Sequence, residues 1–149
     1  MVPIMGRRFT AVLISLVVFS CQWLLAAPAH AAMDVAKQVL IGADYSNKDL
    51  RGATFNLSNL REANLSGSDL RGASLYGAKL QDADLSGTDL REATLDAAVM
   101  TGTNLEDAVL EGAFAFNTRF SDVLITGADF TDVPVSYTHL RAHETSFHL

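Results

Sequence analysis

The sequence has few of the residues on which small stapled or metal-bound domains depend. It contains one Cys (Cys21), one Trp and three Pro in 149 residues, and only 8% of its residues are aromatic. A single Cys excludes an internal disulfide and a multi-cysteine zinc site. The scarcity of rings excludes a core built mainly from large aromatics. Since 49% of the residues are hydrophobic, the chain can still form the core of one domain.

Positive charge is also scarce. Between Ala32 and Pro134 there are 12 Asp and 4 Glu against 3 Lys and 5 Arg, a net charge of −8. A surface of this sign repels phosphate backbones and anionic headgroups. We therefore expect no nucleic-acid partner.

The first 31 residues have the order of a secretory signal peptide. Arg7 and Arg8 precede an apolar run over 9–27, and Ala29 and Ala31 form an A-x-A cleavage site. The pattern predicts cleavage after Ala31, with no membrane attachment afterwards.

The same segment allows three alternatives. The run over 9–27 is almost long enough for a retained membrane anchor. A lipoprotein signal would use "VFSC" with Cys21 acylated, but Phe19 fits that motif poorly and the apolar run continues beyond Cys21. Twin-arginine export would use Arg7 and Arg8, but the usual polar residue before Phe9 is missing.

A five-residue period runs through the rest of the chain. From Tyr45 to Phe130 every fifth residue is large and apolar except Ala115, and two positions earlier stands Ala, Ser or Thr, except at Lys48 and Val123. This period fits neither an α-helix nor a flat strand. It predicts a corner every five residues, with one large side chain pointing inward from each side. "DLRGA" at 49–53 and 69–73 shows that four sides close a coil of twenty residues.

The corners favour glycine, since they need unusual backbone angles. Ala115 interrupts the inward series, and we expect Phe114 or Phe116 to compensate for it, unless the irregular stretch around it is a bulge, a site or an imperfect end cap. The predicted inward ladder is Tyr45, Leu50, Phe55, Leu60, Leu65, Leu70, Leu75, Leu80, Leu85, Leu90, Leu95, Met100, Leu105, Leu110, Phe120, Ile125 and Phe130.

"ANLSG" at 63–67, "ADLSG" at 83–87 and "GADF" at 127–130 resemble the A-(D/N)-L-x-x motif of the pentapeptide-repeat family. The resemblance covers residues 43–132. It implies an all-β fold, a right-handed quadrilateral β-helix of about four and a half coils. Residues 32–42, which are apolar at Val35, Val39 and Leu40, are expected to form an N-terminal cap.

Outside the coil, charged residues recur in register. They form either a stripe that a protein partner recognises or a solvated face in which each Asp column offsets the repulsion within its Arg column. The stripe consists of Asp49, Arg51, Asp69, Arg71, Asp89 and Arg91. A second acidic group, Asp82, Asp84, Glu92 and Asp107, has no convergent geometry, and we expect no metal site and no cofactor.

Residues 133–149 break the repeat. Of these, 135–149 ("VSYTHLRAHETSFHL") resemble the translation of a transposon-type sequencing adapter, so we exclude them from the fold and expect the solenoid's natural end to be truncated. The alternative is a metal-binding tail formed by His139, His143 and His148.

The repeat most resembles small exported pentapeptide-repeat proteins of cyanobacteria and the thylakoid lumen, although it lacks the helical, often cysteine-bearing segment that closes the solenoid in that group. The sequence contains no nucleophile elbow, phosphate loop or His–carboxylate grouping in the repeat, so we expect no enzyme. We expect a structural or protein-interaction module in the thylakoid lumen or periplasm, with an unknown protein partner. The alternative, a DNA-mimicking inhibitor of a type II topoisomerase, fits the acidic charge but not the predicted export or the short repeat.

Overall fold

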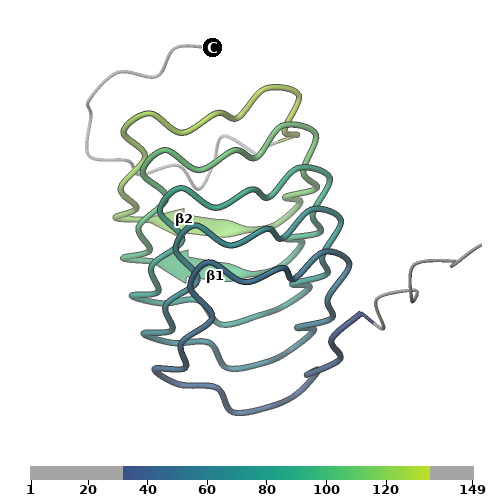
Figure 1. Cartoon of the computed structure of the whole chain (residues 1–149). Coiled ribbons are helices and arrows are strands. Elements are labelled where there is room, and N and C mark those ends of the chain that lie inside the picture. Colours follow the sequence, from purple (N-terminus) through teal and green to yellow (C-terminus); the bar gives the residue numbers. More distant parts are fainter. Residues whose placement is uncertain (1–31, 135–149) are drawn as a thin grey trace, which may run out of the picture. The chain divides into compact units, whose positions relative to one another are not determined.

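The computed structural model describes residues 32–134, which wind into a stack of four-sided coils (Figure 1). The predicted signal peptide and the adapter-like tail lie outside these residues. Two segments form strands, β1 (Val99–Thr101) and β2 (Arg119–Ser121), and they pair in parallel. Elsewhere, parallel bridges join single residues twenty positions apart. The described part contains no helix, and therefore none that could cross a bilayer.

Backbone hydrogen bonds explain why each side has five residues. In the segment 69–73, the N–H groups of Leu70 and Gly72 donate to carbonyls of the following coil at 2.8 and 2.9 Å, and that of Asp69 donates to the preceding coil at 2.9 Å. The N–H of Ala73 closes a turn onto the Leu70 carbonyl at 2.9 Å. The N–H of Arg71 donates to Oδ1 of Asp69 at 3.3 Å. All five donors are therefore satisfied, as a buried backbone requires.

Each corner contains a residue with positive φ. These residues recur at every fifth position from Lys37 to Asp132, with φ between 54° and 73°. They occupy the third position of a four-residue turn, where positive φ is the signature of a type II turn. Glycine adopts this conformation without a steric penalty. At Gly67 it also provides space, because an added Cβ would lie 2.6 Å from Oδ1 of Asn47 in the preceding coil.

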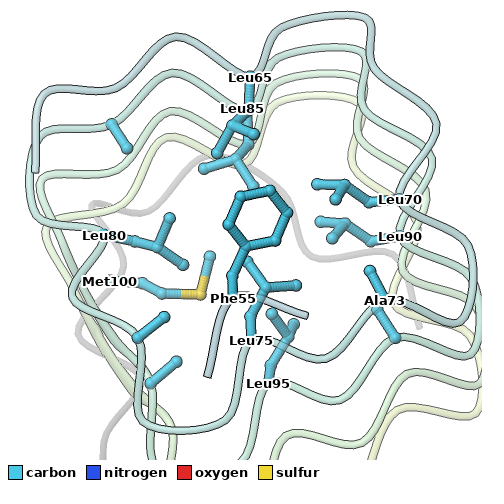
Figure 2. Packing of buried hydrophobic residues seen from close by; sticks show 14 of the residues in the cluster. Phe55, Leu65, Leu70, Ala73, Leu75, Leu80, Leu85, Leu90, Leu95 and Met100 are labelled. Atoms are coloured by element: carbon cyan, nitrogen blue, oxygen red, sulfur yellow. The ribbon is translucent and has the colours of Figure 1, made fainter. Parts of the chain in front are cut away.

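The inward side chains stack in four ladders along the coil axis. Successive members lie one above the other, as Figure 2 shows for Leu65 with Leu85, Leu70 with Leu90, Leu75 with Leu95, and Leu80 with Met100. The small residues two positions earlier, such as Ala73 and Ala93, are also fully buried. The core is therefore a continuous column of aliphatic side chains flanked by methyl groups.

The predicted inward residues are buried along most of the solenoid. Tyr45, Ile125 and Phe130 are only partly buried because they belong to the first and last described coils. Aromatic pairs lie near both ends: the rings of Tyr45 and Phe55 meet edge to face at 5.7 Å, and those of Phe120 and Phe130 do so at 6.1 Å.

The expectation that Phe114 or Phe116 compensates for Ala115 is wrong. Ala115 is buried, whereas Phe114 is 49% exposed and Phe116 is 55% exposed. In an extended segment, the residues before and after an inward residue point to the opposite face. The rings inside this end of the solenoid belong to Phe120 and Phe130.

The segment expected to form an N-terminal cap continues the same repeat. Asp34 bridges Thr54 in the next coil, and Val35 and Leu40 pack against the core. Val39 instead points outward and is 75% exposed. Residues 33–42 therefore supply two sides of the first coil rather than a separate element.

Truncating one inward leucine should destabilise the whole stack. Leu70 is fully buried with ladder neighbours on both sides, so Leu70→Ala should lower the free energy of unfolding by about 2–5 kcal/mol. The control is Leu124→Ala, at an outward position that is 52% exposed, where we expect a change within about 0.5 kcal/mol. Denaturant unfolding followed by circular dichroism measures both. Equal effects would contradict the assignment of the inward ladder.

The same substitution at two adjacent alanines should have opposite effects. Ala97 lies at a corner with φ of 59°, while Ala98 is fully buried. A left-handed conformation costs a non-glycine residue about 1–2 kcal/mol, so Ala97→Gly should raise the melting temperature. Ala98→Gly removes a buried methyl group and should lower it. Thermal melts of the two variants test the corner assignment, which fails if Ala97→Gly is the more damaging change.

Candidate functional site

The four sides of the coil present four different outer surfaces. On each side the inward residue lies between two outward residues, and the corner follows. Side 1 comprises 43–47, 63–67, 83–87, 103–107 and 123–127; side 2 comprises 48–52, 68–72, 88–92, 108–112 and 128–132; side 3 comprises 33–37, 53–57, 73–77, 93–97 and 113–117; side 4 comprises 38–42, 58–62, 78–82, 98–102 and 118–122.

The predicted charged stripe lies on side 2, where the structure brings all six residues together. Within each coil the Arg guanidinium donates two hydrogen bonds to the Asp carboxylate. In one coil, Arg71 donates from Nε to Oδ1 of Asp69 at 2.9 Å and from Nη2 to Oδ2 at 2.6 Å. The other two coils repeat this arrangement, with the closest contacts at 2.7 Å and 2.6 Å.

Two of the three Arg residues also contact the Asp of the following coil; Arg91 does not, because Val109 stands where that Asp would be. Nε of Arg51 lies 3.7 Å from Oδ2 of Asp69, and Nε of Arg71 lies 3.6 Å from Oδ2 of Asp89. The stripe is therefore one alternating chain of charges along the solenoid. Its Arg side chains remain 44–54% exposed, so water screens each pair and each contributes little to stability.

Hydrogen bonding perturbs the acidity of the stripe. The side-chain bond from Arg71 holds the pKa of Asp69 below its ordinary value, and Arg91 does the same for Asp89. The same bonds raise the pKa of Arg71 and of Arg91. The stripe is thus fully ionised and internally neutralised at pH 7. It offers a partner paired charges instead of a bare row of one sign.

Side 1 avoids repulsion between stacked carboxylates in another way. Its outward column alternates Asp44, Asn64, Asp84 and Asn104, and in each of them Oδ1 accepts the N–H two residues ahead at 3.0 Å. Because an Asn separates successive carboxylates, these lie two coils apart, about 10 Å rather than about 5 Å. The Asp and Asn side chains of this column therefore act as acceptors for backbone N–H groups.

The four acidic residues considered as a metal group lie on different parts of the surface. Asp84 belongs to the outward column of side 1, and Asp82, Glu92 and Asp107 occupy corners of sides 4, 2 and 1. Within residues 32–134, no three His, Cys, Asp or Glu side chains gather closely enough to hold a metal ion.

Side 3 has a surface that the sequence analysis overlooked. Leu57, Tyr76, Phe114 and Phe116 are each about half exposed; we call these four residues the side-3 patch. Between residues 53 and 117 the only charged residue of side 3 is Asp96. The signal was present in the sequence, because these large apolar residues stand at positions that are polar in most repeats.

Side 3 supplies the acceptors for its backbone N–H groups differently from sides 1 and 2. Its outward column before the inward residue carries Thr54, Ser74 and Thr94 instead of Asp or Asn. The N–H groups of Tyr76 and Phe116 are bonded by the preceding coil instead, through Oδ1 of Asn56 at 3.1 Å and of Asp96 at 2.7 Å. In the column after the inward residue, short polar residues therefore alternate with aromatic residues, in the order Asn56, Tyr76, Asp96 and Phe116.

These features define a solenoid built from five-residue sides, most of them with an inward Leu or Phe and a small residue two positions earlier. The family model described as pentapeptide repeats matches residues 39–72 and 73–112, in eight copies. The chain belongs to the pentapeptide-repeat family, whose members form right-handed quadrilateral β-helices.

Solved structures of the family include similar proteins. A pentapeptide-repeat protein of the Arabidopsis thaliana thylakoid lumen is 48% identical, with a TM-score of 0.67 over 68% of this chain and 71% of that one. The pentapeptide-repeat protein Rfr23 of the cyanobacterium Cyanothece 51142 is 27% identical, with a TM-score of 0.66 over 67% of this chain and 82% of that one.

A plasmid-mediated fluoroquinolone resistance protein, QnrB1, also aligns, but at 19% identity and a TM-score of 0.32 over 70% of this chain and 61% of that one. A likeness at this level does not bear on function. The comparison with curated proteins found no match.

Acid should weaken the stripe. Because the folded pKa values of Asp69 and Asp89 lie below the ordinary value of about 3.9, their stabilisation is complete above that pH and is lost as pH falls through the folded values. The double variant Asp69→Asn/Asp89→Asn should melt at a lower temperature at pH 7 and lose less of its melting temperature between pH 5 and pH 2.

The matched control is Asp84→Asn, which removes a carboxylate whose Oδ1 accepts the N–H of Ser86 at 3.0 Å. Asn can make the same bond, so this variant should follow the original protein's pH profile more closely. If the double variant and the original protein had parallel pH profiles, the stripe would contribute no ionisation-dependent stability.

Proposed function

We propose that this protein is a non-catalytic, exported structural or protein-interaction module of the thylakoid lumen or the periplasm. The observation that carries the proposal is the 48% identity, over 68% of the chain, to a protein from a thylakoid lumen. The predicted signal peptide at 1–31 supports the same address, although it lies outside the described residues.

The surface supports interaction rather than catalysis. The outward side chains of sides 1 and 2 are occupied with backbone N–H groups and with each other, so they do not converge on a reacting atom. Repetition at the coil spacing instead produces long, regular columns of the kind that a protein partner can match. We expect no cofactor.

The charge distribution weighs against DNA mimicry. A protein that imitates a duplex must present rows of uncompensated negative charge, as phosphates do. On side 2, Arg51, Arg71 and Arg91 neutralise the stacked carboxylates. On side 1, Asn residues dilute the carboxylates. The net charge of −8 is therefore not arranged as a phosphate-like row.

Processing at the N-terminus tests the proposed address. In a cyanobacterial host, the accumulated protein should begin at Ala32 by mass spectrometry and fractionate with the lumen or periplasm. Ala31→Arg should block cleavage, because signal peptidase requires a small residue there. His30→Gln, between the two small residues, should leave processing intact.

A protein that keeps its original N-terminus and stays in the cytosol would overturn the proposal. That outcome would return topoisomerase inhibition to consideration, and a supercoiling assay with purified gyrase would test it.

A further inference from the structure

Side 3 is the surface on which a second copy of the chain can approach most easily. Sides 1 and 2 carry net charges of −4 and −3, the latter from acidic residues outside the stripe, so contact between two copies through either side would be repulsive. Side 4 has no net charge, but it carries six charged residues, and its exposed large apolar residues, Val39 and Ile41, lie only in the first coil. Side 3 carries only Asp96 between residues 53 and 117, together with four exposed apolar side chains. Charge and hydrophobicity therefore favour the same side.

The two outward columns of side 3 have complementary shapes. The column before the inward residue is small and hydroxylated over three coils, at Thr54, Ser74 and Thr94. The column after it carries the projecting ring of Tyr76, which is 49% exposed. A large column beside a small one is a surface on which a rotated copy of itself can fit.

A two-fold axis parallel to the coil axis brings these columns together. It places the column before the inward residue opposite the column after it in the partner, coil by coil. Thr94 then faces the partner's Asp96, a hydroxyl donor against a carboxylate. Phe114 faces the partner's Phe116, and edge-to-face ring pairs of this kind contribute about 0.5–1.5 kcal/mol beyond their burial. An antiparallel pairing centred on these four coils would instead set the Tyr76 ring opposite the partner's Asp96 carboxylate.

We propose that side 3 is a self-association surface, at which two copies of this chain pack side by side and parallel about a two-fold axis. This inference rests on the proposed function, an interaction module, and names a second copy of the chain as its partner. The contacts themselves are argued from side 3 alone. The interface is isologous, so each contact occurs twice.

The size of side 3 sets the strength of the dimer. Five residues at about 3.3 Å, by four coils at about 4.8 Å, give a surface of roughly 16 by 19 Å. That is less than the roughly 800 Å² per partner of a standard stable interface. The dimer is therefore weak and reversible, and it forms at high local concentration.

Cross-linking tests the side and the orientation. In the full chain with Cys21→Ser, Thr54→Cys places one thiol at the N-terminal end of the nearly uncharged stretch of side 3, residues 53–117. A parallel dimer holds the two thiols at the same height, and a short bis-maleimide links them. In an antiparallel dimer they lie at opposite ends of the interface. The control, Asn64→Cys, occupies the equivalent outward position on side 1 and should not cross-link.

A second experiment measures the strength of association. Sedimentation equilibrium of the full chain, at increasing concentration, compares Phe116→Ser with Leu124→Ser. Both remove an outward apolar side chain, 55% and 52% exposed, so both should leave the fold intact by circular dichroism. Phe116→Ser should weaken dimerisation about tenfold, because it removes the ring that faces the partner's Phe114 in both copies of the isologous interface, and Leu124→Ser should not. Any association through residues 1–31 is common to all variants.

Two outcomes would overturn the inference: Thr54→Cys linking no faster than Asn64→Cys, or Phe116→Ser dimerising as well as Leu124→Ser. Neither affects the proposed function, which is tested by the processing site and location of the chain. A failed dimer with normal export would leave an exported module with a different partner.

Discussion

The rest of the structure depends on one constraint, the distribution of five backbone N–H donors on each side of the coil. Two donate to the following coil, one to the preceding coil and one across the corner, and wherever an Asp or Asn precedes the inward residue on sides 1 and 2 the fifth donates to its side chain. The constraint explains why Asp and Asn recur beside the inward residue, and why the corners need positive φ.

Because the coils stack in register, a residue type that recurs at one position of the repeat forms a column along the solenoid. Identical side chains repeat at the coil spacing of about 4.8 Å, so like charges face each other unless something intervenes. Side 2 inserts guanidinium groups between carboxylates, with cross-coil contacts of 3.6 and 3.7 Å. Side 1 alternates Asp with Asn. Side 3 carries Thr, Ser and aromatic residues on its outer surface. The N–H groups of Tyr76 and Phe116 therefore donate to Asn56 and Asp96 of the preceding coil, instead of to an Asp or Asn two residues earlier. The sides are therefore electrostatically distinct although their backbones are equivalent.

Inward and outward positions of the solenoid therefore have different tasks. The outward side chains project in parallel columns, the arrangement on which the proposed interaction role rests, and the buried leucines supply stability. Sequence reasoning identified these inward positions because burial follows directly from the period. It assigned Phe114 and Phe116 wrongly because it treated large apolar residues as core-filling, and the alternation of an extended segment turns both outward.

The sequence by itself determined the period, the family, the inward ladder and the register that brings Asp49, Asp69 and Asp89 into one column, because each follows from a repeat that does not slip between residues 43 and 132. Only the tertiary structure decided how the columns are used: that each Arg of the stripe bonds the Asp of its own coil and that Arg51 and Arg71 also reach the Asp of the next, that residues 33–42 extend the coil, and that side 3 gathers exposed rings into one nearly uncharged surface. The physical reason is that periodicity specifies which residues share a column, while the direction and partners of an outward side chain depend on the coils before and after it.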